Sequence, residues 1–154
     1  MKARTLVLTL ALSAIGAATA LAQAPQMGTW KLDEGKSKVP ANYMKNTTVT
    51  YEMAGDNIKV TTEGVDAKGN PLHTEWTGKF DGKDYPLTGD PNADSRAYKL
   101  VNDNTLTLEN KKDGKAVTSG RITVAADGKT RTLKVNGTDA NGKKVTSTAV
   151  YTKE

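Results

Sequence analysis

The only histidine, His73, is the first side chain to consider as a catalyst. It lies on the polar side of an alternating segment, Leu72 to Phe80, with Glu75 on the same side. A general base of this kind needs a nucleophile within hydrogen-bond reach and a group that orients its ring. The chain has no cysteine and no Gly-x-Ser-x-Gly motif. We therefore expect no catalytic residue and no enzymatic activity.

The segment Asp90 to Ser95 has oxygen-bearing side chains at alternate positions, as calcium-binding loops do. Pro91 stiffens it, Ser95 stands where such a loop has glycine, and Val101 stands where it has its closing glutamate. An ordinary polar turn fits these residues better. We expect no metal site, and nothing else in the sequence indicates a cofactor.

Arg96 is the side chain best suited to hold an anion. It shares one side of its strand with Tyr98 and Leu100, so we expect it to point inward. A guanidinium can bind a carboxylate or phosphate through two parallel hydrogen bonds. The alternative is a strand-end side chain that reaches out to water. Arg131 also shares a side with apolar neighbours, but it begins its strand at the opposite end, so we do not expect the two to clamp one anion.

Short alternating strands must position these side chains. Val49, Tyr51 and Met53 lie on one side of a segment whose other side carries Thr48 and Thr50. The same two-residue period recurs to the C-terminus, and no segment after residue 22 has a helical period. The sequence thus predicts an all-β fold, an antiparallel up-and-down meander of about 8–10 strands, and closure into a barrel would remove its two open edges.

Nearly all the large rings fall on the inward sides of these strands. They either fill a core or line a cavity. The inward positions between them are small, which indicates close backbone packing or empty space: Thr62, Gly64, Thr74, Gly78, Thr118, Gly120, Ser147 and Ala149. We take as candidates to line a ligand cavity Tyr51, Trp76, Phe80, Arg96, Tyr98 and Tyr151.

The connections between strands differ at the two ends of the predicted barrel. Short turns at 55–56, 81–83, 103 and 127–128 fall at one end, and longer ones at 33–45, 66–70, 89–94, 111–114 and 137–143 fall at the other. A barrel that is closed at one end and open at the other suits ligand binding. Chance variation in loop length is the alternative.

Residues 1–22 have the features of an export signal. Lys2 and Arg4 precede an apolar run, which ends in Ala20-Leu21-Ala22. We expect cleavage before Gln23, a single β-barrel domain over 23–154, and a periplasmic or extracellular location. The apolar run is short and has no charged stop after it, so we expect no stable membrane anchor.

The charge of the chain is mildly positive, with 22 Lys and Arg against 17 Asp and Glu. The basic residues are spread evenly, whereas nucleic-acid-binding proteins cluster them on one stripe. We therefore expect no nucleic-acid partner.

Both ends of the predicted domain resemble the calycin superfamily. Gly28-Thr29-Trp30 is similar to the Gly-x-Trp opening of lipocalins, and its continuation through Leu32 is similar to the first strand of fatty-acid-binding proteins. The last strand, Val145 to Tyr151, resembles the closing strand of the second group. The resemblance implies a lipocalin-like barrel with Gly28 and Trp30 as structural residues at its base.

Two departures limit what this resemblance implies. Fatty-acid-binding proteins hold the ligand carboxylate with an Arg-x-Tyr motif, and here Ala149 stands in the Arg position before Tyr151. Their two-helix lid falls at 33–45, where this chain is shorter and contains Pro40. We expect the lid to be absent or a single turn. Separately, the segment Phe80 to Gly89 resembles small exported bacterial proteins without assigned roles.

These observations favour an exported, non-enzymatic protein that binds a small apolar or amphipathic molecule inside the barrel. The alternative is a filled barrel that uses its loops as a protein-interaction or inhibitor module, with a protein as its partner.

Overall fold

The computed structural model describes residues 24–154, and the predicted export signal at 1–22 lies outside these residues. Within them, two short 3₁₀ turns, η1 (Ala24–Gln26) and η2 (Glu34–Lys36), accompany ten strands. The strands are β1 (Gly28–Leu32), β2 (Lys45–Ala54), β3 (Asn57–Val65), β4 (Pro71–Gly78), β5 (Asp81–Thr88), β6 (Ser95–Asn102), β7 (Thr105–Lys112), β8 (Lys115–Val124), β9 (Thr130–Thr138) and β10 (Lys144–Lys153).

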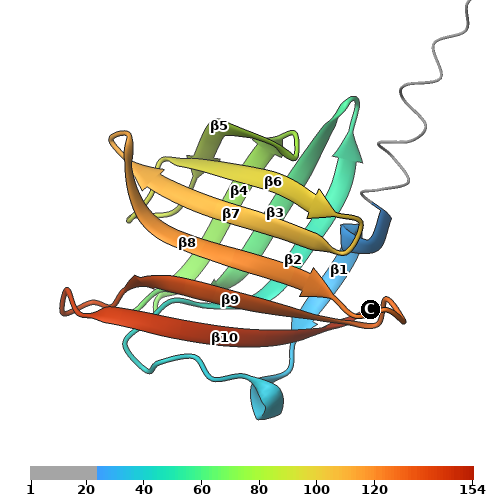
Figure 1. The fold of residues 1–154 in the computed structure, drawn as a ribbon. Helices are drawn as coiled ribbons and strands as arrows, with labels where there is room; N and C mark the ends of the chain where they lie inside the picture. The colour runs from blue at the N-terminus through green and yellow to red at the C-terminus, as the bar shows by residue number, and fades with distance from the viewer. Residues whose placement is uncertain (1–23) are drawn as a thin grey trace, which may run out of the picture.

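The strands form one closed antiparallel barrel in which each pairs with the next and β1 lies between β2 and β10 (Figure 1). Trp30 faces Lys153 of β10 and Val49 of β2 across this closure. The predicted all-β meander of antiparallel strands and its closure into a barrel are confirmed. Closure pairs the backbone donors and acceptors that an open sheet would leave free at its edges.

Trp30 closes the end of the barrel where the β6–β7 turn lies. Its side chain is fully buried, and its indole N–H donates to the carbonyl of Gln26 at 2.9 Å. The side chain of Gln26, also fully buried, donates to the carbonyl of Asn104 in that turn. Gly28 has a φ of +103°, a conformation that glycine adopts without strain. These contacts place Gly28 and Trp30 at the base of the barrel.

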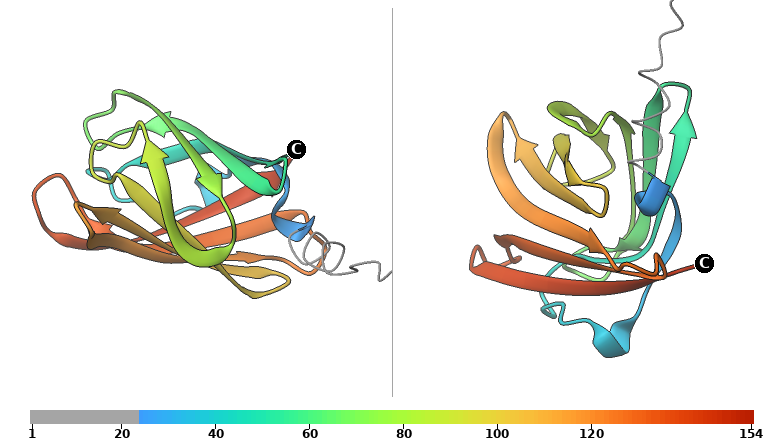
Figure 2. Two further views of the ribbon diagram at one scale, coloured as in Figure 1. Left: turned by 90° about the horizontal axis from the view of Figure 1, so that it is seen from above. Right: turned by 45° about the vertical axis from the view of Figure 1, so that its right-hand side comes forward.

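The connection from β1 to β2 contains a single 3₁₀ turn, η2, and no longer helix, as expected. Asp33 caps it, because its carboxylate accepts the amide N–H of Lys36. The chain then follows β10, where Lys38 and Thr148 exchange backbone hydrogen bonds in both directions. Figure 2 shows this segment, drawn in cyan, running beside β10. The segment is thus fixed to the last strand.

Four rings fill part of the barrel interior. Trp76 and Tyr98 have centroids 4.8 Å apart in an edge-to-face arrangement, and Phe80 packs on both. Tyr51 meets Phe80 and Tyr98 at 6.4 and 6.3 Å. Such contacts are favourable beyond the burial of ring area. We call these four residues the ring cluster.

Three of the small inward glycines serve close packing. A Cβ atom at Gly78 would collide with the rings of Tyr85 and Trp76, and one at Gly120 would collide with Val135. At Gly64 it would collide with the backbone of the neighbouring strand β2. The absence of a side chain at these positions therefore leaves no empty space.

Two connections differ from the sequence-based expectation. The expected turn at 81–83 lies inside β5 at a bulge, where Gly82 has a φ of +80°. The expected longer loop at 111–114 is a tight turn, since β7 ends at Lys112 and β8 begins at Lys115. Glycine permits a bulge within a strand as well as a turn between strands, and its presence alone does not distinguish them.

Among residues 24–154, no helix has the length and apolar character needed to cross a membrane.

The close approach at Gly64 predicts a sharp cost for a small substitution. Gly64→Ala would force β3 away from β2 and lower the free energy of unfolding by about 1–3 kcal/mol. Gly35→Ala is the matched control, because a Cβ there makes only an ordinary contact with Asp33. Urea denaturation measures both variants. Equal stability of Gly64→Ala and wild type would contradict this packing.

Candidate functional site

A cavity of about 60 Å³ lies inside the barrel, bordered by Tyr51 and Tyr98 of the ring cluster and by Val39, Tyr43 and Met44 of the segment before β2. Its wall combines apolar side chains, among them Val49 and Leu133, with several polar ones. The small inward residues that border it are Thr62, Thr118, Ser147 and Ala149. Unlike the three glycines, these residues do mark open volume.

The structure divides the candidate ligand residues into two groups. Tyr51, Arg96, Tyr98 and Tyr151 line the cavity. Trp76 and Phe80 lie outside its wall and pack in the buried core. A role for any of the six in binding a ligand stays a prediction.

Arg96 points inward, and it is 8% exposed. Its Nε donates to the side-chain oxygen of Asn110 at 2.6 Å, and its Nη1 donates to the hydroxyl of Tyr98 at 3.1 Å. Its backbone carbonyl accepts the indole N–H of Trp76. Neutral partners therefore hold Arg96, and its contacts join the cavity wall to the ring cluster.

Arg131 is a cavity residue that sequence reasoning did not select. It is 2% exposed and contributes to the cavity wall. Its guanidinium carbon lies 4.9 to 5.0 Å from the ring centroids of Trp30, Tyr51 and Tyr151. Three aromatic faces therefore surround one buried cation.

The two arginines approach the cavity from different directions. Arg96 and Arg131 stand near the starts of β6 and β9, at opposite ends of the barrel, yet both contribute to the wall of one cavity. Arg131 alternates with Leu133 and Val135 along its strand, so the sequence already indicated that its side chain points inward. That alternation was the sequence signal for its place in the cavity wall.

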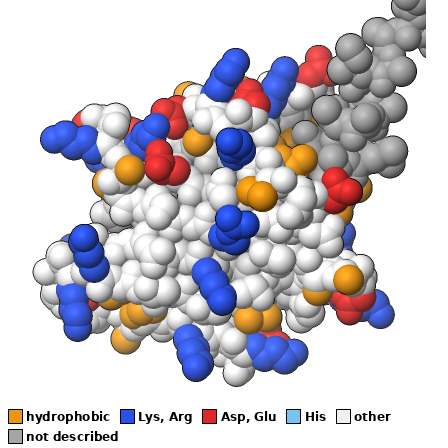
Figure 3. All heavy atoms as spheres, viewed as in Figure 1, with side chains coloured by type: hydrophobic (Ala, Val, Ile, Leu, Met, Phe, Trp, Pro, Cys, Tyr) orange, Lys and Arg blue, Asp and Glu red, His pale blue; other side chains and the backbone are white. Residues whose placement is uncertain are grey.

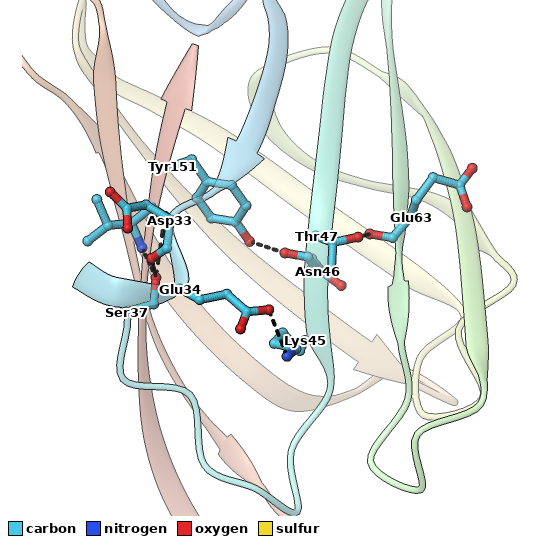
Figure 4. Close-up of polar contacts among 9 residues, drawn as sticks. Asp33, Glu34, Ser37, Lys45, Asn46, Thr47, Glu63 and Tyr151 are labelled. Carbon is cyan, nitrogen blue, oxygen red and sulfur yellow. Dashed lines mark hydrogen bonds and ion pairs between the residues drawn. The ribbon is translucent and has the colours of Figure 1, made fainter. Parts of the chain in front are cut away.

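Polar contacts fix the edge of the cavity near β2 (Figure 4). The hydroxyl of Tyr151 donates to the carbonyl of Asn46 at 3.0 Å, and Lys45 pairs with Glu34 of η2 at 3.0 Å. The register between β2 and β3 shifts beside Asn46, next to the close approach of Gly64. This irregularity presents the Asn46 carbonyl to the Tyr151 hydroxyl.

Three tyrosines that line the cavity, Tyr43, Tyr98 and Tyr151, stay protonated at neutral pH. Burial raises the pKa of Tyr151 to about 12. Burial also raises the pKa of Tyr98, although Arg96 and Arg131 both act to lower it. The pKa of Tyr43, which lines the cavity from the segment before β2, is raised chiefly by burial. Each phenol can therefore donate a hydrogen bond.

His73 lies away from the cavity on the exposed outer face. Its ring nitrogens contact Glu63 on β3 and Glu75 on β4. Hydrogen bonds that the His73 ring donates to the carboxylate of Glu63, first, and of Glu75, second, raise the pKa of His73. The two carboxylates orient the ring, but their contacts supply no nucleophile, and this arrangement is an exposed charge cluster.

The loop at Asp90 has the geometry of a polar turn. The Asp90 carboxylate accepts the amide N–H of Asn92 at 2.8 Å, and Ala93 is buried in the core. Among residues 24–154, no group of three or more His, Cys, Asp or Glu side chains is arranged to hold a metal ion.

A second hollow, of about 510 Å³, lies on the outside of the barrel over β5 to β9. Exposed Lys99, Arg121 and Lys134 border it together with Glu109. Figure 3 shows basic side chains spread singly over one face of the molecule, with acidic ones toward its margins. The basic side chains on this face are separated, and they do not form a dense cluster.

No known protein-family pattern matches this chain, and no curated protein matches it. The solved structures that are similar to it include two with bound DFHBI. EF1p2_mFAP2b bound to DFHBI is 12% identical, with a TM-score of 0.47, over 87% of this chain and 99% of that one. The redesigned beta barrel mFAP1 bound to DFHBI is 16% identical, with a TM-score of 0.44, over 86% and 99%. The fold assignment rests on the strand order and register of this chain.

The pKa of His73 predicts a pH dependence of stability. Because the folded pKa is raised above its ordinary value of 6.5, the His73 contribution is full below that value and is lost as pH rises through the folded pKa. Wild type should therefore lose stability between about pH 5.5 and about pH 8.5, and Glu63→Gln should lose less.

Urea midpoints at both pH values measure this effect. Glu52→Gln is the matched control, because Glu52 is an exposed glutamate on the neighbouring strand β2. It should keep the wild-type pH dependence. The assignment is wrong if Glu63→Gln and Glu52→Gln show the same pH dependence.

Proposed function

We propose that this chain is an exported, non-enzymatic protein that binds a small amphipathic molecule inside its barrel. The observation that carries the proposal is the interior cavity, whose wall joins apolar side chains to a few oriented polar groups. Ligand sites in proteins have this composition. A periplasmic or extracellular location belongs to the same proposal and follows from the features of residues 1–22.

The apolar part of the wall offers a place for a hydrocarbon group. Val49, Leu133 and Ala149 contribute to it from β2, β9 and β10. Arg131, whose Nε and Nη1 have no hydrogen-bond partner in the described part of the chain, offers hydrogen bonds to a polar group. A ligand with one apolar and one polar part would satisfy both kinds of surface.

The small volume of the cavity favours an alternative function, that of a protein-interaction or inhibitor module. The ring cluster fills much of the interior, and about 60 Å³ is open. A filled barrel could act through its loops as a protein-interaction or inhibitor module. Binding of small probes separates the two functions, because the module needs no cavity.

Filling the cavity should weaken the binding of small molecules. Ala149→Leu would place a larger side chain in the open volume, whereas Ala116→Leu makes the same change at an exposed position on β8. NMR titrations with 1-butanol, butylamine and butanoate should show binding of at least one of these probes to wild type and to Ala116→Leu. Ala149→Leu should bind the probes at least about tenfold more weakly, because the leucine side chain occupies the volume that they need. A tenfold loss of affinity corresponds to about 1.4 kcal/mol.

Folding of both variants is checked by circular dichroism. Failure of every probe to bind wild type would overturn the proposal and favour the interaction module. Undiminished binding to a folded Ala149→Leu variant would place the probes outside this cavity.

A further inference from the structure

Arg131 brings a permanent positive charge into the barrel. An arginine side chain stays protonated in proteins, and this one is 2% exposed. Its Nε and Nη1 are buried and make no hydrogen bond within residues 24–154. None of the ion pairs in that part of the chain includes it. A buried charge without a hydrogen-bonded partner is strongly unfavourable.

Three rings compensate part of this charge. The guanidinium lies over Trp30, Tyr51 and Tyr151 at cation–π distances. Ring faces attract a cation, but the contacts leave Nε and Nη1 without an oxygen acceptor in the described part of the chain. The rings therefore hold Arg131 in place with part of its donor capacity unused.

The charge of the cavity wall favours an anion. Lys45, Arg96 and Arg131 contribute to the wall, and no Asp or Glu among residues 24–154 does. Arg96 already donates to Asn110 and Tyr98. Arg131 is thus the guanidinium in this wall with the greater unused hydrogen-bonding capacity, because its Nε and Nη1 have no partner in the described part of the chain.

The register of β9 and β10 places apolar wall beside Arg131. Arg131 faces Tyr151 across the two strands, and the next inward pair is Leu133 and Ala149. A ligand whose anionic group binds Arg131 would therefore place its remaining atoms against Leu133 and Ala149. Hydrocarbon next to a single incompletely paired guanidinium suits a carboxylate better than a phosphate, which carries more charge and needs more donors.

We propose that the ligand is a small carboxylate whose head group binds Arg131 and whose apolar part packs against Leu133 and Ala149. This inference rests on the proposed function and names the ligand class of the same site. A water needs about 10–15 Å³ of such volume, so the 60 Å³ here holds about four to six water-sized groups. Butanoate is within this range.

The test compares butanoate with 1-butanol, a neutral probe of similar size. Wild type should bind butanoate at least about tenfold more tightly, because a hydrogen bond to a charged group is worth about that factor or more. Arg131→Met keeps an unbranched side chain among the rings and removes the charge. It should lose that preference while it still binds 1-butanol.

Arg121→Met is the matched control, because Arg121 is exposed on the outer face. It should bind both probes as wild type does. If wild type binds butanoate and 1-butanol equally, or if folded Arg131→Met keeps the preference, the carboxylate site is overturned while the proposed function stands. If neither probe binds wild type, the proposed function is overturned, and the carboxylate site is overturned with it.

A second measurement on wild type covers the case in which Arg131→Met does not fold. The side-chain Nε–H resonance of Arg131 should shift on addition of butanoate and stay unchanged with 1-butanol. A resonance that does not respond to bound butanoate overturns the inference.

Discussion

The pairing of β1 with both β2 and β10 is the constraint on which the rest of the structure depends. It turns a meander with two open edges into a barrel, and it gives the chain an interior. Trp30 stands at this junction, with its ring in the barrel base and its backbone paired to Val49 and Lys153. The inward side chains of β2 and β10 come together on either side of β1 through this closure.

The interior has two parts with different chemistry. The ring cluster is tightly packed. Its rings come from β2, β4 and β6 and, with Phe80, from the turn between β4 and β5. The cavity beside it is lined by arginines, tyrosine hydroxyls and aliphatic side chains. Tyr51 and Tyr98 belong to both parts, so the rigid cluster positions one side of the cavity. Preorganisation of this kind lowers the entropic cost of binding a ligand.

Alternation along the strands was enough to predict the barrel and the inward direction of its rings. It did not separate Trp76, in the core, from Tyr151, at the cavity, because both have inward positions and only three-dimensional packing distinguishes them. Arg131 was undervalued for a related reason. Its strand position correctly placed it far from Arg96 along the barrel, but a long side chain can reach a shared interior volume from its end. Gly64 was ambiguous until the approach of the β2 backbone was known.

The most direct test of the central claim, a ligand site inside the barrel, is the pattern of intermolecular nuclear Overhauser effects between the methyl group of butanoate and the methyl groups of the protein. Binding in the cavity predicts contacts to Leu133 and Ala149, which line it. Contacts only to exposed methyl groups such as those of Val117, or no contacts at all, would contradict the claim.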